Sequence, residues 1–561
     1  MADKDEGGIK MVIGVVSEPG EDANQFVFVT PDDTELKTGE FVKYEASVEL
    51  EHEREIKEKK RRIFARVINR EQCRGFPDRF MSNPDVPPKL VARKLGISSE
   101  ETDLYRIKAV VIGYYDERLN DFTNPRIVPN PGTEIELATN DELEEFLTEA
   151  SSDAGGTALI GELLHRSPGE TEISLPIDAF TSTHLSILAS TGSGKSYTAA
   201  VIAEEMMKPD SKAAMLIIDP HGEYGTLKEI EERNQDIFQD ADEGYSPSVQ
   251  IWSPEDIKIQ ISELTQSDLF SILDNPSDAQ EQVLSEAWDN LQNKDNEYIS
   301  LEEIKEECAS VGDSMDLESS ARALDWRLEK ALNRDLFHHS KHISLSSNQN
   351  ERGLLRPGQC TVLRLDTMGL RDQQMLTTVL LRKINQARIE AEKGRESELD
   401  FPVFVMLEEG HRFAPADGSA RSLGVLSTIL SEGRKFGVGI GIISQRPSKI
   451  DDDVLSQCKT QIIMQIKNPT DQEAVRRSVE GVGEDLLSEL PGLTPGQAVV
   501  SGDSVNTPFL CRIRERHTEH GAESLETTRI WREEWQKLDR EPDGLAEPEV
   551  EEGTEDRDET L

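Results

Sequence analysis

Short, almost continuous apolar segments recur between about residues 155 and 520, and helix-forming segments separate them. Such segments have the length of β-strands that are buried on both faces, which are typical of a parallel sheet covered by helices. The pattern therefore predicts an α/β domain with a parallel-rich sheet. The predicted strands are 185–189, 214–219, 360–365, 403–407, 439–444 and 461–465.

The alternation of strands and helices stops between residues 262 and 345, where the sequence is strongly charged and helix-forming throughout. A block of this kind inside an α/β pattern predicts a helical insertion. We therefore expect the α/β domain to be formed by two separate parts of the chain, 155–261 and 346–520.

Residues 1–140 carry short β-rich segments separated by turns, and these favour a small β-barrel. A charged segment, 49–62, has a helix-forming composition and is expected to interrupt the barrel, while 140–149 is predicted as a connecting helix. The predicted barrel strands are 11–17, 25–29, 64–68 and 105–113.

The last part of the chain, 521–561, begins with a helix-forming segment at 526–538 and ends in a run rich in Glu, Asp and Pro. A run with so few apolar residues cannot bury enough surface to fold, so the tail is expected to be disordered.

The charge balance is strongly acidic, with 62 Lys and Arg against 109 Asp and Glu. Such a balance ordinarily argues against nucleic acid as a partner. Because the acidic residues occur in every predicted domain, we favour adaptation to high intracellular salt, under which DNA is not excluded. Five scattered cysteines predict reduced thiols, and the absence of long apolar runs and of a signal peptide predicts a soluble, cytoplasmic protein with no membrane contact.

A loop of small residues follows the predicted strand 185–189, and a helix-forming segment, 197–207, follows the loop. This order is that of a phosphate-binding loop, where backbone N–H groups and the helix N-terminus face the phosphates. Lys195 is expected to bind phosphate and Ser196 to bind Mg²⁺. The flanking elements disfavour an accidental Gly/Ser-rich loop. The predicted ATP contacts are Ala189, which stands where glycine is usual, Thr191, Gly192, Ser193, Gly194, Lys195, Ser196 and Tyr197.

Two other predicted strands end in acidic residues. Glu408 and Glu409 follow strand 403–407, where P-loop ATPases carry one acid that supports Mg²⁺ and a second that activates the attacking water. The alternative for this pair is two solvated acids at a strand end. Asp219 and Glu223 follow strand 214–219 and are expected to reach the nucleotide or its water, because ligands bind at the carboxyl ends of such strands. The alternative for Asp219 is a purely structural turn.

The segment around the predicted strand 439–444 carries further candidates. Ser444 and Gln445 lie at the strand end and are placed to sense the γ-phosphate. Arg434 precedes the strand, away from the nucleotide edge, and a guanidinium there suits completion of a neighbouring subunit's site. An ordinary surface ion pair is the alternative for Arg434, and Lys435 and Arg446 are rival candidates.

These segments together resemble the HerA-type archaeal DNA translocases, in the HerA/FtsK branch of P-loop ATPases. The N-terminal β-rich unit resembles the small HAS barrel of that family, and Gly410 stands where the family usually has alanine. The resemblance is carried by 131–135, 189–196, 217–224, 407–413, 432–437, 443–449, 455–458, 466–472 and 490–496.

The resemblance implies a RecA-like ATPase core in a homo-oligomeric, hexameric ring that drives double-stranded DNA through a central channel. It also implies that Glu408 supports Mg²⁺, that Glu409 polarises water and that Arg434 acts in a neighbouring subunit's site. Family members work with the nuclease NurA in DNA end resection during recombination repair, with the barrel as the expected platform. The expected DNA contacts, chosen from loop position, are Arg412, Arg421 and Lys449.

Two other functions remain compatible with the sequence. One is a conjugation or secretion motor of the same superfamily, which would normally bring a membrane segment or a membrane partner. The other is a nucleotide-gated ring scaffold for a nuclease, which would assemble without moving DNA. A P-loop kinase is disfavoured because the acidic pair suits the activation of water.

Overall fold

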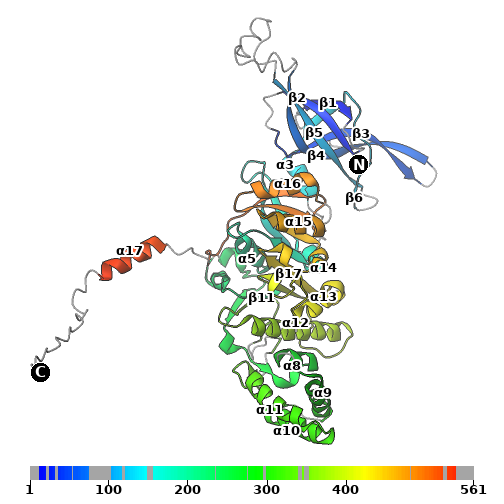
Figure 1. Ribbon diagram of the computed structural model, residues 1–561. Helices are drawn as coiled ribbons and strands as arrows, with labels where there is room; N and C mark the ends of the chain where they lie inside the picture. The colour runs from blue at the N-terminus through cyan, green and yellow to red at the C-terminus, as the bar shows by residue number, and fades with distance from the viewer. Residues whose placement is uncertain are drawn as a thin grey trace, which may run out of the picture. The chain divides into compact units, whose positions relative to one another are not determined.

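A computed structural model describes most of the chain (Figure 1). The described residues are 12–19, 24–31, 36–52, 55–74, 103–116, 121–147, 156–233, 235–273, 276–294, 298–338, 344–346, 353–479, 482–521 and 527–538. The chain divides into two units, Met1–Glu519 and His520–Leu561. Among the described residues, no helix is both long and apolar enough to cross a membrane.

Six strands near the N-terminus close into a β-barrel in the order β2-β1-β7-β3-β4-β5, with β5 pairing back to β2. Side chains alternate between the inside and the outside of the barrel, so that Phe26 and Phe28 of β2 are fully buried. The predicted small barrel is therefore confirmed. Its strands, with β6 added beside β5, are β1 (Val12–Pro19), β2 (Gln25–Pro31), β3 (Phe41–His52), β4 (Glu55–Arg74), β5 (Asp103–Asp116), β6 (Asp121–Thr123) and β7 (Glu134–Leu137).

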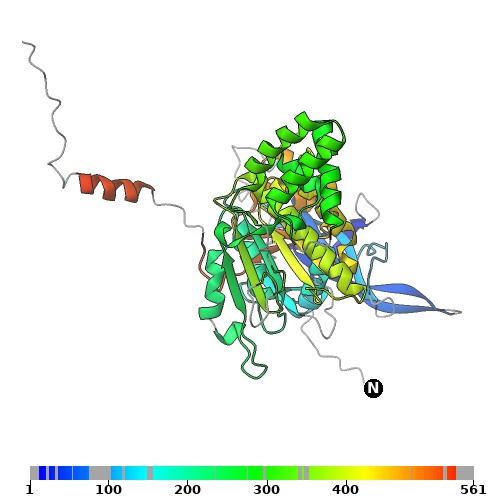
Figure 2. The same ribbon diagram turned by 90° about the horizontal axis from the view of Figure 1, so that it is seen from below.

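The helix expected at 49–62 is wrong, because this segment forms the far part of a long β3–β4 hairpin, which projects from the barrel in Figure 2. The antiparallel ladder runs without interruption from the pair Phe41 and Arg66 to the pair His52 and Glu55. Opposite charges face each other along it, as Glu45 and Arg62 do, and such cross-strand pairs stabilise a ladder. Continuation of the barrel strands therefore outweighs the local helix propensity.

The second sheet has eleven strands in the order β12-β15-β11-β16-β17-β10-β18-β19-β20-β8-β9, and neighbouring strands are parallel from β12 to β18. The predicted parallel-rich α/β core is therefore confirmed. The strands are β8 (Thr157–Leu163), β9 (Glu172–Pro176), β10 (Leu185–Leu188), β11 (Ala214–Asp219), β12 (Ser248–Trp252), β15 (Gln359–Arg364), β16 (Val403–Leu407), β17 (Val438–Ser444), β18 (Thr460–Met464), β19 (Gln497–Gly502) and β20 (Phe509–Ile513).

Helices cover both faces of this sheet, as the side chains of β11 show. Met215 and Ile217 belong to one buried cluster with the apolar residues of α5 (Lys195–Met206), whereas Leu216 and Ile218 belong to another with those of α12 (Leu370–Glu392). Burial on both faces explains why the central strands are apolar at nearly every position. The remaining helices are α3 (Asn140–Leu147), α4 (Ile177–Thr183), α6 (Glu229–Glu232), α7 (Gln235–Phe238), α13 (Ser422–Glu432), α14 (Asp452–Gln457), α15 (Pro469–Ser478) and α16 (Glu484–Glu489).

The expected helical insertion is present and is drawn in green in Figure 1. Two short parallel strands, β13 (Ile259–Gln260) and β14 (Phe337–His338), pair where it begins and ends. Capping boxes, in which a Ser or Thr and an acid or amide three residues later satisfy the first N–H groups, open α8, α9 and α10. Its helices are α8 (Gln266–Ile272), α9 (Asp278–Gln292), α10 (Leu301–Ser314) and α11 (Glu318–Leu332).

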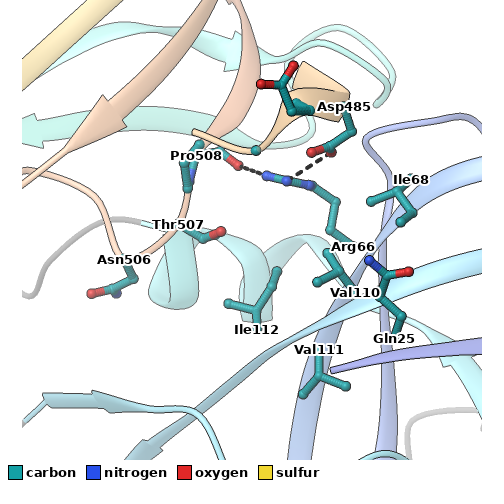
Figure 3. Close-up of a pocket in the computed structure, with 12 residues that line it drawn as sticks. Gln25, Arg66, Ile68, Val110, Val111, Ile112, Asp485, Asn506, Thr507 and Pro508 are labelled. Carbon is teal, nitrogen blue, oxygen red and sulfur yellow. Dashed lines mark hydrogen bonds and ion pairs between the residues drawn. The ribbon is translucent and has the colours of Figure 1, made fainter. Parts of the chain in front are cut away.

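The barrel contacts the large sheet through the buried Arg66 of β4, which Figure 3 shows at the edge of a pocket. Its guanidinium donates to the carbonyl of Pro508 at 2.7 Å and to the carboxylate of Asp485 on α16 at 2.9 Å. A buried charge needs such partners, so this contact fixes β4 against α16 and the start of β20.

The second unit contains α17 (Thr527–Leu538), which lies where the C-terminal helix is predicted. Trp531 and Trp535 are exposed on it. The expected disordered acidic tail after residue 538 lies outside the described residues.

Candidate active site

The phosphate-binding loop connects β10 to α5 at the centre of the large sheet. Gly192 and Gly194 have φ values of 79° and 105°, a left-handed backbone that favours glycine. The loop is anchored on both neighbouring strands, since Ala189 N–H donates to Ser444 O and Ser190 N–H donates to Gln465 O. Ala189 does not have a positive φ, so its backbone conformation is open to alanine as well as to the usual glycine.

Lys195 opens α5 and points to the two acids that follow β16. Its ammonium donates to Oε1 of Glu408 and, at 3.0 Å, to Oε1 of Glu409. The strand β17 lies between β10 and β16, so the lysine reaches across one strand to meet the carboxylates. The structure therefore brings together the loop lysine and the acidic pair that the sequence singled out.

The two carboxylates have different electrostatic environments. Burial raises the pKa of Glu408 to about 7, although Lys195 and the hydroxyl of Tyr224 act in the opposite direction. Burial also opposes ionisation of Glu409, but the neighbouring His411 and Lys195 outweigh it and lower its pKa to about 2. Glu409 is thus the carboxylate that stays ionised at neutral pH.

Glu409 also has an unusual backbone. Its φ of 54° and ψ of 50° are left-handed, a conformation that costs a non-glycine residue roughly 1 kcal/mol or more. Its Oε2 is buried and accepts no hydrogen bond, with Nδ1 of His411 at 3.2 Å. A strained, buried carboxylate whose Oε2 has only His411 beside it is arranged to receive a proton or a bound water.

The acids after β11 separate into two roles. Glu223 accepts a hydrogen bond from Ser196 Oγ, so it lies beside the phosphate loop. Asp219 is buried and accepts from the backbone N–H groups of His221, Gly222 and Tyr224 at 2.8–3.2 Å. Asp219 therefore closes the turn that presents Glu223, while Glu223 itself lies at the site.

The residues expected to sense the γ-phosphate lie at the end of β17. Gln445 Oε1 accepts a hydrogen bond from Thr191 Oγ1 at 2.6 Å, which joins it directly to the phosphate loop. Ser444 is buried, and its hydroxyl lies 3.3 Å from Nδ1 of His411. The end of β17 is thus connected to both the loop and the neighbourhood of Glu409.

The residues present fit a nucleotide-bound Mg²⁺. Magnesium in nucleotide sites takes one or two protein oxygens and several phosphate or water oxygens, not a full protein cage. Ser196, Glu223 and Glu408 present oxygens beside the loop, and Oε2 of Glu409 accepts no hydrogen bond among the described residues. Accordingly, the described residues contain no group of three or more His, Cys, Asp or Glu that could hold a metal ion alone.

Residues 158–384 match the family model described as "Helicase HerA, central domain". The DNA double-strand break repair helicase HerA of Pyrococcus furiosus is 30% identical over 424 residues, which cover 66% of this chain and 72% of that protein. The chain belongs to the HerA helicase family. The HerA of Saccharolobus solfataricus is 29% identical over 399 residues, covering 70% of this chain and 75% of that protein. Among solved structures, VirB4 of Thermoanaerobacter pseudethanolicus is 14% identical, with a TM-score of 0.48 over 65% of this chain and 98% of VirB4.

As a HerA-family protein with a P-loop ATPase core, the chain is an ATP-hydrolysing, DNA-processing enzyme of the helicase and translocase type. Tyr197, expected at the nucleotide, accepts a hydrogen bond from the backbone N–H of Arg516 at 2.7 Å, and the Arg516 guanidinium lies 5.7 Å from its ring centre. The side of the HerA site next to Tyr197 is therefore formed by the chain that follows β20.

Arg434 lies on a 3₁₀ turn, Gly433–Lys435, directly before β17, and its side chain is exposed. Because β16 and β17 are parallel, a residue before β17 lies at the edge of the sheet opposite to Glu409. Within one subunit Arg434 is therefore separated from the phosphate loop, as the sequence predicts. Arg446 is exposed and directly follows Gln445 at the nucleotide edge.

The three predicted DNA contacts have different surroundings. Arg412 is half-buried and donates to Gln373 Oε1 at 3.1 Å, so it supports α12. Arg421 is exposed and donates to Ser267 Oγ at 2.7 Å. Lys449 is exposed on a 3₁₀ turn, and its carbonyl accepts from Ala416 N–H.

Two residues at the HerA site were not assigned a role from the sequence. Tyr224 is buried and its hydroxyl donates to Glu408 Oε2, while His411 lies beside Oε2 of Glu409. Tyr224 and Glu408 are 184 positions apart, so only the fold brings them together. Both residues lie in the segments that carry the family resemblance, which is the one signal the sequence offers.

Proposed function

We propose that this chain is an ATP-dependent translocase and helicase on double-stranded DNA that forms a hexameric ring and acts with a NurA-type nuclease in DNA end resection. The single observation that carries this proposal is the placement of Lys195 between Glu408 and Glu409 at the foot of the phosphate loop. HerA relatives named as double-strand break repair helicases support the choice of DNA.

ATP and Mg²⁺ are the proposed substrate and cofactor. When bound, Mg²⁺ would neutralise charge on the β- and γ-phosphate oxygens, and Ser196, with Glu223 and Glu408 beside it, would hold it. Lys195 would exchange its carboxylate partners for phosphate oxygens. That exchange would free Glu409, already ionised, to orient a water in line with the γ-phosphate and to accept its proton. Gln445, which accepts from Thr191 of the loop, would move with the γ-phosphate and so change the position of the end of β17.

Arg434 is the proposed arginine that a neighbouring subunit inserts into the site. Its exposure and its position at the opposite edge of the sheet suit action in trans, because it has no path to the loop of its own subunit. A guanidinium at the transferring phosphoryl group stabilises the charge that develops there.

The proposed domains are the barrel (1–140), the two parts of the core (155–261 and 346–520), the helical insertion (262–345) and a C-terminal part (521–561). The barrel is the proposed platform for the nuclease. The net charge of -47 supports the proposal that the protein works in a salt-rich cytoplasm, such as that of a halophilic archaeon.

Glu409→Gln is the experiment that tests a translocase against a nucleotide-gated scaffold. The variant should bind nucleotide and assemble, yet unwind no DNA and give the partner nuclease no stimulation, because the water is no longer activated. Unwinding and nuclease stimulation are measured on linear duplex DNA in molar KCl. A variant that still stimulates the nuclease fully would favour the scaffold.

A further inference from the structure

A cleft of about 830 Å³ lies between the helical insertion and the ATPase core. Its walls come from α8, from α11, from the first turns of α12 and from the loop that leads into α13. The lining contains five basic side chains and only two carboxylates, whereas the chain as a whole has 62 basic and 109 acidic residues. The basic residues are Arg327, Lys330, Arg334, Arg371 and Arg421.

Both carboxylates of the cleft are already paired. Asp268 accepts from Arg382 at 2.7 Å, and Asp372 accepts from Arg334 at 2.8 Å. The lining therefore carries more positive than negative charge, although the chain as a whole is strongly acidic. A local excess of cations on a strongly acidic protein indicates a site for an anionic ligand. Elsewhere on the protein, negative charge would repel such a ligand.

The cations come from three separate segments of the chain that line the cleft. Arg327 and Lys330 are three residues apart on one face of α11, and Arg334 follows two residues after that helix ends. Arg371 lies in the first turn of α12, and Arg421 lies directly before α13. Cations spread over several segments can contact the repeated phosphates of a nucleic-acid backbone, whereas a single small anion would contact only a few of them.

Two exposed apolar side chains lie among these charges. Trp326 is 64% exposed, with Lys330 5.4 Å from its ring centre, and Leu370 is 49% exposed. Interleaved cations and apolar groups are typical of surfaces that bind phosphates and also cover the sugars between them.

The cleft is also connected to the catalytic carboxylate. Gln374, which lines the cleft, donates to the carbonyl of Arg412 at 2.6 Å. The backbone N–H of Arg412 in turn donates to the carbonyl of Glu409 at 2.8 Å. A ligand that shifts the start of α12 therefore acts on the strained backbone of Glu409 through two hydrogen bonds.

We propose that this cleft binds the phosphate backbone of double-stranded DNA and that the helical insertion is a DNA-binding element of the motor. The inference rests on the proposed function, since it names where the DNA of that function is held. DNA bound here contacts α12 and α11 together, so the insertion and the core grip the same duplex.

The test replaces Lys330 and Arg421 by glutamine together, which removes one cation from each side of the cleft. Binding of a fluorescent linear duplex is measured by anisotropy with a non-hydrolysable ATP analogue between about 0.5 and 2 M KCl, a range in which screening is strong. The double variant should bind about tenfold more weakly or worse, and its log–log salt slope should fall by about 2, because two phosphate contacts are lost.

The matched control is Arg322→Gln, an exposed cation on α11 that pairs with Glu318 and does not line the cleft. It should bind duplex like the wild type. If the wild type binds duplex and the double variant binds it equally well, the cleft assignment is overturned while the proposed function stands. If the wild type binds no duplex, the proposed function fails as well. Unchanged DNA binding with a raised basal ATPase in the double variant would show that an acidic protein segment fills the cleft, which also overturns the inference.

Discussion

The two adjacent glutamates at the end of β16 are held in different ways, and that difference assigns their roles. Glu408 is fully buried between Lys195 and Tyr224, whereas Glu409 lies beside His411 and its Oε2 accepts no hydrogen bond. The sequence predicted the pair and its lysine, because both stand at recognisable positions around apolar strands. It could not assign Tyr224, since a contact between residues so far apart depends on the order of strands in the sheet.

Tyr224→Phe removes the hydroxyl that orients Glu408. A hydrogen bond to a charged group contributes about 1.5–3 kcal/mol, so we expect turnover of ATP to fall about tenfold or more. Steady-state ATPase assays check this result. Tyr245→Phe is the matched control, because that hydroxyl donates to the carbonyl of Met207 and has no contact with the acidic pair. Equal turnover of the two variants would remove Tyr224 from the site.

His184 gives the fold a pH dependence of its own. Its Nε2 lies 3.1 Å from the carbonyl of Leu430 and its Nδ1 accepts from Ile440 N–H, so the ring is neutral, and burial lowers its pKa to about 4. The unfolded chain, with a pKa near 6.5, binds more protons between pH 4 and 6.5. The free energy of unfolding should therefore fall by up to about 3 kcal/mol as the pH drops through this range.

The measurement is denaturant unfolding at several pH values, with His184→Gln for comparison. Glutamine can accept and donate at the same two places without titrating, so the difference in unfolding free energy between the two proteins should narrow as the pH falls. A constant difference from pH 7 to pH 5 would contradict the neutral, buried histidine.

At the scale of elements, strands formed where apolar residues are continuous: the parallel strands β10, β11, β15, β16, β17 and β18 follow the prediction within one or two residues. The parallel edge strand β12 was not predicted. The antiparallel strands β8, β9, β19 and β20 were not predicted, because polar or partly exposed positions interrupt their apolar residues. Only the far part of the β3–β4 hairpin, residues 49–62, differs from the predicted helix, since its charged composition does not reveal a ladder that depends on pairing with the neighbouring strand.

Buried charges hold the antiparallel part of the sheet, which ends with β20, against α5, the helix that follows the phosphate loop. Glu204 and Glu205 of α5 are buried and accept from Arg514, which follows β20, at 3.0 and 2.6 Å. Arg514→Ala would leave both carboxylates with fewer partners, so we expect a loss of about 3–5 kcal/mol of stability.

Arg512→Ala is the matched control, since Arg512 lies on β20 and is 49% exposed with a 3.7 Å ion pair to Glu162. Its removal should cost less than about 1 kcal/mol. Thermal or denaturant unfolding measures both variants. Similar losses would mean that the buried network does not stabilise the docking of this strand on α5.

If Arg434 completes the site of a neighbouring subunit, as proposed, the subunits of the whole assembly share their active sites. Lys195→Ala and Arg434→Ala proteins should each be inactive, but mixed rings contain some interfaces that join an intact Lys195 to an intact Arg434. Those interfaces should restore part of the ATPase activity, with a maximum at intermediate mixing ratios. An arginine acting within its own subunit would give no restoration, because no Arg434→Ala subunit could then hydrolyse ATP.

The activity proposed for the site formed by Lys195, Glu408 and Glu409 is ATP hydrolysis coupled to the processing of DNA. The most direct measurement is the steady-state ATPase rate in molar KCl, with and without linear duplex DNA, for the wild type and for Lys195→Ala. In the wild type, we predict a basal rate of ATP hydrolysis that rises several-fold with DNA. In Lys195→Ala, we predict no ATP hydrolysis with or without DNA. A wild-type ATPase rate that does not change with duplex DNA, or a Lys195→Ala protein that still hydrolyses ATP, would contradict DNA-coupled ATP hydrolysis at this site.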